Sequence, residues 1–172
     1  MRKKIISYNV NGIRAALNKD FDKWLASESP DIIMIQEVKA QKDQISFSVF
    51  ENLGYNVCWN AAEKKGYSGV AILSKNKPDE VKYGFGNDFF DAEGRFIQIM
   101  IDGITYINSY FPSGSSGDVR QSVKEEYLEI ILNYCRQLLK DRKDVVVSGD
   151  FNICHKPIDI NHPERQTGVS GF

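Results

Sequence analysis

Short apolar segments rich in β-branched or aromatic residues recur along the 172-residue sequence, and segments with helical periodicity lie between them. The apolar segments that predict strands are Ile5–Val10, Ile32–Gln36, Tyr55–Asn60, Gly69–Ser74, Glu80–Gly84, Arg95–Ile101, Ile104–Tyr110 and Val145–Ser148. The segments that predict helices are Asp20–Ser27, Lys42–Leu53 and Val119–Lys140. This interleaving of strands and helices is typical of a layered α/β fold.

The dipeptide Asp102-Gly103 separates two of the predicted strands, which end at Ile101 and begin at Ile104. Asp and Gly tolerate the positive φ angles of a two-residue hairpin turn, so this dipeptide predicts an antiparallel hairpin. A hairpin within an α/β sequence indicates a mixed sheet rather than a purely parallel one.

The composition is that of an ordinary globular domain and excludes several other classes of protein. Hydrophobic residues make up 42% of the chain, and Lys and Arg (22) nearly balance Asp and Glu (23) for a net charge of −1. A disordered chain is therefore excluded, and a polyanionic partner is expected to be held by a local patch or a bound metal. Three widely spaced cysteines, no bilayer-spanning apolar stretch and no signal-peptide pattern predict a cytoplasmic protein without a membrane partner.

Polar residues follow four of the apolar segments, at the positions where the predicted strands end. They are Asn9 and Asn11, Gln36 and Glu37, Asn108 and Tyr110, and Asp150 and Asn152. Side chains at positions i and i+2 of an extended chain point to the same face, so each such pair can reach one point. Oxygen donors without Cys or His suit Mg²⁺, Mn²⁺ or Ca²⁺ rather than zinc. Each residue alone is more often a turn former or a cap, and the combination on four strands is what favours a site.

Five segments of the sequence carry a further signal. They are Ser7–Ala15, Ile35–Lys39, Gly66–Val70, Asn108–Pro112 and Ser148–Ile153. In this order and at this spacing they resemble the signature segments of the exodeoxyribonuclease III type of apurinic/apyrimidinic (AP) endonucleases, which belong to the Mg²⁺-dependent endonuclease/exonuclease/phosphatase superfamily. The resemblance implies a four-layer α/β sandwich of the DNase I-like type, of which this chain is expected to cover mainly the first sheet-and-helix half.

The resemblance also implies a role for each polar residue at the strand ends. Glu37 resembles the principal metal-ligating carboxylate, with Asn9 close to the same ion. Asp150 resembles the residue that orients or deprotonates the attacking water, and Asn152 resembles a donor to the scissile phosphate. Tyr110 resembles the active-site tyrosine that contacts the phosphate. The implied catalytic residues are thus Tyr110, Asp150 and Asn152, and the implied ligands of Mg²⁺, or of Mn²⁺ in its place, are Asn9, Glu37, Asp150 and Asn152.

The residues that the resemblance places along DNA are Arg14, Lys39, Tyr67 and Arg95. The implied activity is hydrolysis of phosphodiester bonds at abasic sites and 3′ ends of duplex DNA during DNA repair. The balance between AP endonuclease, 3′ to 5′ exonuclease and 3′ phosphatase activity stays open. Two alternative interpretations are a superfamily phosphodiesterase or phosphatase acting on another substrate, and a non-catalytic DNA-binding fragment.

The sequence departs from the family pattern in three respects. Asn11 stands where some members carry Asp, and Ser113 stands where others carry Asn. The Ser-Asp-His segment that the family carries near its C-terminus does not occur. We therefore expect residues 1–172 to form a single, C-terminally incomplete domain that is weakly active or inactive alone, and the full-length protein to be a monomer.

Overall fold

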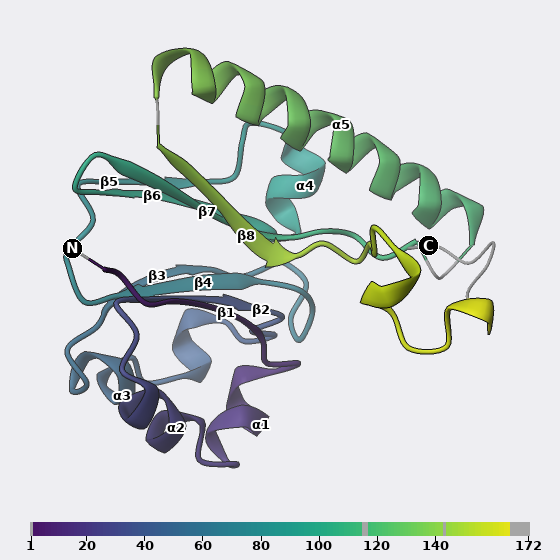
Figure 1. Ribbon diagram of the computed structural model, residues 1–172. Helices are drawn as coiled ribbons and strands as arrows, with labels where there is room; N and C mark the ends of the chain where they lie inside the picture. The colour runs from purple at the N-terminus through teal and green to yellow at the C-terminus, as the bar shows by residue number, and fades with distance from the viewer. Residues whose placement is uncertain (1, 115–116, 143, 166–172) are drawn as a thin grey trace.

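The structure is a computed structural model that describes residues 2–114, 117–142 and 144–165, and the strands of this part of the chain form two four-stranded sheets (Figure 1). The first sheet has the order β1-β2-β4-β3 and consists of β1 (Ile5–Asn9), β2 (Ile32–Gln36), β4 (Val70–Ser74) and β3 (Asn56–Asn60). The second has the order β5-β6-β7-β8 and consists of β5 (Glu80–Tyr83), β6 (Phe96–Ile101), β7 (Ile104–Tyr110) and β8 (Val145–Asp150). Both sheets are mixed, because β1 is parallel to β2 and β7 is parallel to β8 while the other pairs are antiparallel.

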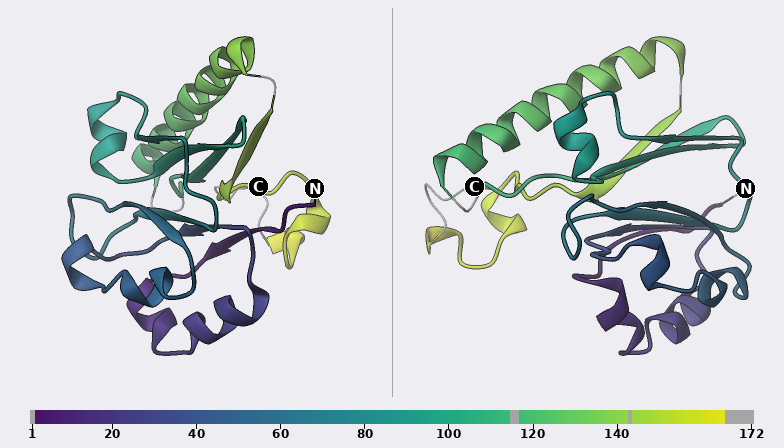
Figure 2. Two further views of the ribbon diagram at one scale, coloured as in Figure 1. Left: turned by 90° about the vertical axis from the view of Figure 1, so that its left-hand side faces the viewer. Right: turned by 180° about the vertical axis from the view of Figure 1, so that it is seen from behind.

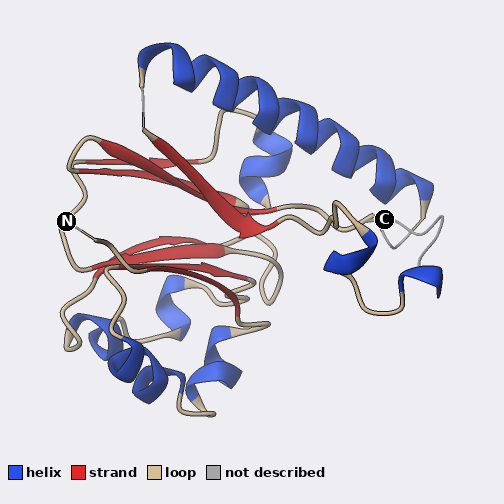
Figure 3. Cartoon of the chain, viewed as in Figure 1, coloured by secondary structure: helices blue, strands red, loops and turns tan. Residues whose placement is uncertain are grey.

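Helices cover the outer face of each sheet, which gives four layers (Figures 2 and 3). The helices on the first sheet are α1 (Ile13–Leu17), α2 (Phe21–Glu28) and α3 (Ser48–Glu51). The helices on the second sheet are α4 (Asp88–Ala92) and α5 (Asp118–Asp141). Short 3₁₀ helices span Lys42–Gln44, Pro157–Asp159 and Pro163–Arg165. Among the helices of the described residues, none has the length and hydropathy needed to cross a membrane.

Apolar residues on both faces of the central strands explain this layering. All five residues of β2 are buried, because one face of the strand meets the second sheet and the other meets the helices. Met34 of β2 packs in a cluster with Ile72 and Tyr106 between the sheets, whereas Ile33 packs in a cluster with Leu25 of α2. A third cluster, between the second sheet and helices α4 and α5, includes Phe96, Tyr127 and Ile131.

The predicted α/β fold class is confirmed, but the prediction that the chain covers mainly one sheet-and-helix half is wrong. The described residues build four strands of each sheet and place helices on both outer faces. The reason for the error is that the period of an apolar pattern identifies a strand without identifying the sheet that the strand joins.

The predicted strands are confirmed, with bounds that differ by no more than two residues, and so is the hairpin, in which Asp102 and Gly103 have φ angles of 53° and 77°. The predicted helix Lys42–Leu53 is wrong. Ile45, at φ −143° and ψ 139°, is extended and separates the 3₁₀ turn Lys42–Gln44 from α3. Helices α1 and α4 were not predicted, because five residues are too few to show helical periodicity.

Asn108 connects the two sheets through buried hydrogen bonds close to the candidate site described below. Its Nδ2 donates to the Ile35 carbonyl at 2.9 Å and to the Ala71 carbonyl at 2.8 Å, and its Oδ1 accepts from Gln36 Nε2 at 2.7 Å. The side chain crosses from β7 to β2 and β4, and Asn108 is 0% exposed. These bonds fix the register of one sheet against the other near the ends of β2 and β7.

Asn108→Ala is expected to lower the free energy of unfolding by about 2–4 kcal/mol, because it leaves buried polar partners on both sheets without their hydrogen bonds. Chemical denaturation measures this loss. Asn133→Ala, at an exposed position of α5, is the matched control and is expected to change stability by less than about 0.5 kcal/mol. Equal losses for the two variants would contradict the role assigned to Asn108.

Candidate functional site

The predicted polar residues gather where four strands end at one edge of the sandwich. Asn9 is the last residue of β1, and Glu37 directly follows β2, which is parallel to β1. Tyr110 and Asp150 are the last residues of β7 and β8, which are also parallel to each other. Each sheet thus contributes two neighbouring carboxyl-terminal strand ends, the place where α/β sheets commonly bind ligands.

The side chains of these four residues are joined by hydrogen bonds. Asn9 Nδ2 donates to Glu37 Oε1 and to Asp150 Oδ2, both at 2.8 Å, and the Tyr110 hydroxyl donates to Glu37 Oε1 at 2.8 Å. Asn9 Oδ1 accepts from the Asn11 backbone N–H at 2.9 Å. That bond sets the orientation of the Asn9 amide, so its NH₂ group lies between the two carboxylates.

Glu37 is a carboxylate surrounded by donors. Lys39 Nζ lies 2.7 Å from Glu37 Oε2, and the Glu37 side chain is 16% exposed. Burial raises the pKa of Glu37, but the hydrogen bonds from Asn9, Lys39 and Tyr110 outweigh it, so the pKa lies below its ordinary value. Burial and the bond to Glu37 raise the pKa of Tyr110. Glu37 is therefore ionised and Tyr110 carries its proton near neutral pH.

The backbone at the site adopts conformations that non-glycine residues rarely take. Glu37 has a φ of 55° and Asn152 has a φ of 50°. Backbone bonds hold the Glu37 turn: Gly12 N donates to the Glu37 carbonyl at 2.7 Å, and Val38 N donates to the Gly69 carbonyl at 3.1 Å. Left-handed non-glycine residues that the surroundings hold in place cluster at functional sites, which agrees with the location of this turn.

Asp150 and Asn152 form a second turn, opposite Glu37. The Asn152 backbone N–H donates to Asp150 Oδ1 at 3.1 Å, so both oxygens of the Asp150 carboxylate accept a hydrogen bond. Asn152 Nδ2 donates to the Phe111 carbonyl at 2.8 Å, and Phe111 N donates to the Asp150 carbonyl at 2.9 Å. The orientation of the Asp150 carboxylate is therefore fixed by β1 on one side and by its own turn on the other.

The donor set of the site fits a hard divalent cation. Glu37 and Asp150 supply carboxylates, Asn9 joins them through hydrogen bonds, and oxygen ligands of this type suit Mg²⁺ and Mn²⁺. Within the described part of the chain, no group of three or more His, Cys, Asp or Glu residues forms an alternative metal cluster. Ligation through Asn9 Oδ1 stays a prediction, since that oxygen accepts from Asn11 here.

Arg95 and Tyr67 lie behind Tyr110 in a polar cluster. Arg95 is 2% exposed, and its guanidinium donates to Glu93 Oε2 at 2.6 Å, the Tyr110 carbonyl at 3.0 Å and the Tyr67 hydroxyl at 2.9 Å. The guanidinium carbon also lies 4.8 Å from the centre of the Tyr110 ring. Arg95 therefore supports Tyr110 in this structure, and its predicted contact with DNA stays a prediction.

Arg14 and Lys39 line a cavity of about 530 Å³ beside the Glu37 turn, together with Gly12 and Gly66. Arg14 is exposed on α1. Lys39 Nζ donates to Asn11 Oδ1 in addition to its ion pair with Glu37. These two cations thus line one cavity next to the candidate metal site.

Comparison with known proteins decides the family. The sequence pattern of the endonuclease/exonuclease/phosphatase family matches residues 6–171. The chain belongs to this family. Among curated relatives, an exodeoxyribonuclease of Bacillus subtilis is 38% identical over 170 residues, which cover 98% of this chain and 66% of the relative. A DNA-(apurinic or apyrimidinic site) endonuclease of Dictyostelium discoideum is 31% identical over 170 residues, which cover 98% of this chain and 47% of that protein.

The chain has the same fold as two solved structures of nucleases. An AP endonuclease from Archaeoglobus fulgidus superposes with a TM-score of 0.85 at 32% identity, covering 96% of this chain and 63% of that one. A 3′-5′ exonuclease from Neisseria meningitidis superposes with a TM-score of 0.89 at 28% identity, covering 98% of this chain and 65% of that one. The chain thus spans about two thirds or less of the length of these relatives.

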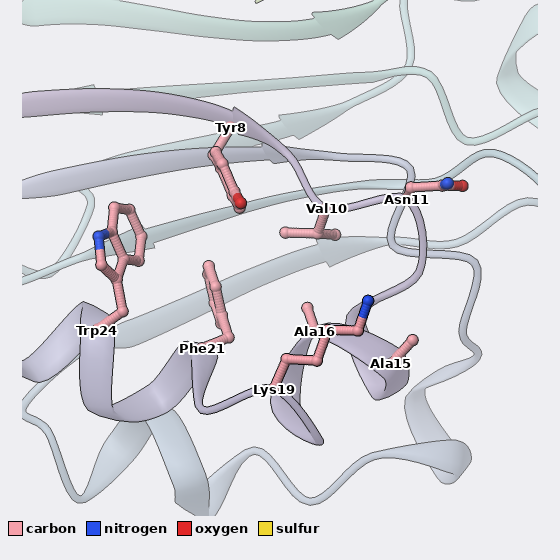
Figure 4. A pocket seen from close by; sticks show the side chains of 8 residues that line it. All are labelled: Tyr8, Val10, Asn11, Ala15, Ala16, Lys19, Phe21 and Trp24. Carbon is pink, nitrogen blue, oxygen red and sulfur yellow. The ribbon is translucent and has the colours of Figure 1, made fainter.

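This family member also has a hollow of about 480 Å³ on the other face of β1 (Figure 4). Side chains alternate along a strand, so Tyr8 points away from the site that Asn9 faces. The Tyr8 ring stacks on the Phe21 ring, with ring centres 6.0 Å apart, and the centres of the Tyr8 and Trp24 rings are 5.3 Å apart. The hollow is lined by Tyr8, Val10, Asn11, Ala15, Ala16, Lys19, Phe21 and Trp24. None of these lining residues carries a carboxylate, and Asn11, which is hydrogen-bonded to Asn9 and Lys39, connects the hollow to the cluster around Glu37.

Sequence reasoning missed three residues beside the family's site: Glu93, Arg120 and Lys124. Glu93 pairs with Arg95, and Arg120 donates to the Tyr67 hydroxyl at 3.1 Å. Lys124 Nζ donates to the Asn152 carbonyl at 2.8 Å. Lys124 carried a detectable signal, because it is a charged residue on the apolar face of a predicted helix. Glu93 and Arg120 carried no such signal, since the residues around them in the sequence form no motif and no apolar periodicity that would single them out.

Proposed function

We propose that this chain carries the metal and phosphate site of a Mg²⁺-dependent DNA-repair nuclease that hydrolyses phosphodiester bonds at abasic sites and 3′ ends of duplex DNA. The observation that carries the proposal is the hydrogen-bonded cluster of Asn9, Glu37, Tyr110 and Asp150 at the strand ends. Relatives named as an exodeoxyribonuclease and as an AP endonuclease support DNA as the substrate.

Each residue of the site has its own role in the proposed hydrolysis. Asp150, whose two carboxylate oxygens are held in place, orients the attacking water and accepts its proton. Tyr110 keeps its proton and would turn its hydroxyl from Glu37 Oε1 to a phosphate oxygen. There it and the Asn152 amide donate to phosphate oxygens and stabilise the negative charge that develops. Glu37 supplies the anionic ligand for the cation. Water attack then leaves a 3′ hydroxyl and a 5′ phosphate.

Glu37 and Asp150 would hold Mg²⁺ or Mn²⁺, with Asn9 and Asn152 as further proposed ligands. When bound, the cation would act as a Lewis acid on the phosphoryl oxygen and stabilise the leaving 3′ oxygen. Lys39 competes with a cation for the Glu37 carboxylate, since its Nζ lies 2.7 Å from Oε2. A cation at Glu37 would free Lys39 to contact phosphate.

DNA contacts are proposed for Arg14, Lys39, Tyr67 and Arg95. Arg14 and Lys39 line one cavity beside the site, and Tyr67 and Arg95 are hydrogen-bonded to each other behind Tyr110. The cations Arg14 and Lys39 can hold the DNA backbone despite the net charge of −1. We further propose that the full-length protein acts as a cytoplasmic monomer.

We expect residues 1–172 alone to have far less activity than their longer relatives, because these residues cover 66% or less of the relatives' length. The test uses a duplex with one synthetic abasic site, incubated with the chain in Mg²⁺ or in EDTA. We expect weak incision at the abasic site in Mg²⁺ and none in EDTA. The exodeoxyribonuclease of Bacillus subtilis serves as the reference enzyme.

Other outcomes of this assay would contradict parts of the proposal. Turnover near that of the longer relative would overturn the expected weak activity. Mg²⁺-dependent binding of the duplex without incision would favour a non-catalytic DNA-binding fragment. Hydrolysis of a phosphomonoester or of another phosphodiester, with no action on the abasic duplex, would favour a phosphatase or phosphodiesterase with a different substrate.

A further inference from the structure

Lys124 is a buried cation on the inner face of α5. It is 2% exposed and precedes Tyr127 and Ile131, which belong to the apolar cluster between α5 and the second sheet, by three and seven residues. Burying an ammonium group costs several kcal/mol unless hydrogen bonds compensate for the lost water. Desolvation also lowers the pKa of Lys124 below its ordinary value. An apolar side chain would avoid this cost, so packing does not explain the lysine.

One contact of Lys124 leads directly into the candidate site. Its Nζ donates to the Asn152 carbonyl at 2.8 Å. The same Asn152 donates through its backbone N–H to Asp150 Oδ1 and through its side chain to the Phe111 carbonyl. Asp150 Oδ2 in turn accepts from Asn9. A continuous series of hydrogen bonds therefore runs from the α5 ammonium through Asn152 and Asp150 to β1.

The conformation of Asn152 explains why its carbonyl needs a strong partner. Asn152 has a φ of 50°, a left-handed conformation that is uncommon for non-glycine residues and that Asn tolerates better than most. A hydrogen bond from a charged donor is stronger than one from a neutral donor, and burial strengthens it further. The Asn152 carbonyl and the Asn152 N–H belong to successive peptide units that meet at the Asn152 Cα. By holding the carbonyl, the ammonium of Lys124 therefore favours the left-handed backbone conformation of Asn152, and in that conformation the N–H donates to Asp150.

We propose that Lys124 is a positioning residue of the nuclease site: its ammonium holds the Asn152 carbonyl and so fixes the turn that presents the Asp150 carboxylate and the Asn152 amide to the scissile phosphate. This inference rests on the proposed function. It assigns a task to a residue that does not itself touch the substrate. Misplacing a reacting group by about 1 Å can cost about 100-fold in rate, so the loss of this hydrogen bond has a measurable consequence.

The first test compares cleavage of the abasic duplex by Lys124→Met, Lys124→Arg and the matched control Lys140→Met, which is exposed near the end of the same helix. Lys124→Met is expected to lower kcat about 10- to 100-fold with KM changed less than about threefold. Lys124→Arg keeps a charged donor and is expected to retain most of kcat. Lys140→Met is expected to have the same kcat and KM as the unmodified chain. Thermal unfolding of Lys124→Met is expected close to the temperature of the unmodified chain, because removal of a buried charge favours folding while loss of the hydrogen bond to Asn152 opposes it.

The second test needs no activity. In ¹⁵N NMR spectra the backbone amide of Asn152 and its side-chain NH₂ are expected to shift or broaden in Lys124→Met and in Lys124→Gln, and to stay unchanged in Lys140→Met. Unchanged Asn152 signals in the folded Lys124 variants would overturn the inference, as would unchanged kcat. The inference would also be overturned if the Lys124 variants lose activity only in proportion to a lower unfolding temperature, because that result indicates a purely structural role.

The two tests separate failure of this inference from failure of the proposed function. If the unmodified chain leaves abasic DNA intact while the Asn152 signals respond to Lys124→Met, the proposed function fails for this chain, and the result still shows that Lys124 sets the conformation of the Asn152 turn. If the unmodified chain cleaves the duplex and Lys124→Met cleaves it equally well, the proposed function stands and the positioning role fails.

Discussion

Gly149→Ala is expected to lower the free energy of unfolding by about 3 kcal/mol or more, because the new methyl group has no space. A Cβ at Gly149 would lie 1.8 Å from the Ser109 carbonyl oxygen on β7 and 2.8 Å from its carbon, and Gly149 has a φ of 149°. These are backbone atoms of the paired strand, so relief requires β7 and β8 to separate. Asp150 is the next residue, and such a separation displaces its carboxylate.

Urea denaturation measures the stability of Gly149→Ala. Gly103→Ala is the matched control: Gly103 also has a positive φ, 77°, but a Cβ there meets no atom within 4 Å. The control is expected to lose only the cost of the left-handed backbone, about 1–2 kcal/mol. Equal losses in the two variants would show that the close approach of β7 to Gly149 does not determine stability.

Glu37→Gln is expected to lower the Mg²⁺-dependent cleavage rate of this chain about 100-fold or more, since it removes the anionic ligand that holds the cation. The fold is expected to remain intact. The Gln side chain keeps an oxygen that can accept from Asn9 and Tyr110, and the Lys39 side chain that loses its ion pair is 33% exposed, so the variant is expected to lose about 1–2 kcal/mol of stability. Activity should therefore fall about 100-fold while the unfolding temperature in EDTA falls by only a few degrees.

The measurements are single-turnover cleavage and thermal unfolding with and without Mn²⁺. A cation that binds the folded state raises the unfolding temperature, and we expect this rise in the unmodified chain but not in Glu37→Gln. Glu51→Gln, at an exposed position of α3, is the control and should keep the rise. A full Mn²⁺-dependent rise in Glu37→Gln would place the cation elsewhere.

The sequence predicted the ends of the strands and hence the edge of the fold where Asn9, Glu37, Tyr110 and Asp150 meet. Apolar strands followed by oxygen-bearing residues carry this information locally, because the backbone direction of a strand decides where its last side chains lie. The order of the family's segments then assigned roles to these residues. The hydrogen bonds from Asn9 to Glu37 and Asp150 agree with that grouping.

Contacts between distant segments could not be predicted in the same way. The assignment of β5–β8 to a second sheet depends on which apolar faces meet in space, and sequence periodicity does not contain that information. The resemblance placed Arg95 along DNA, and the sequence did not show that its side chain is 2% exposed and bonded to Glu93. The hydrogen bond from Lys124 to Asn152 joins α5 to the turn after β8 and could not be predicted from the sequence either.

The most direct test of the central claim, that the Glu37 and Asp150 cluster is a divalent-cation site, is anomalous diffraction from a crystal soaked in Mn²⁺. We predict an anomalous peak within about 2.3 Å of a carboxylate oxygen of Glu37 and adjacent to Asp150, with Lys39 Nζ displaced from Glu37 Oε2. A crystal that binds Mn²⁺ elsewhere, or that keeps the Lys39 to Glu37 ion pair with no peak beside it at saturating Mn²⁺, would contradict the account.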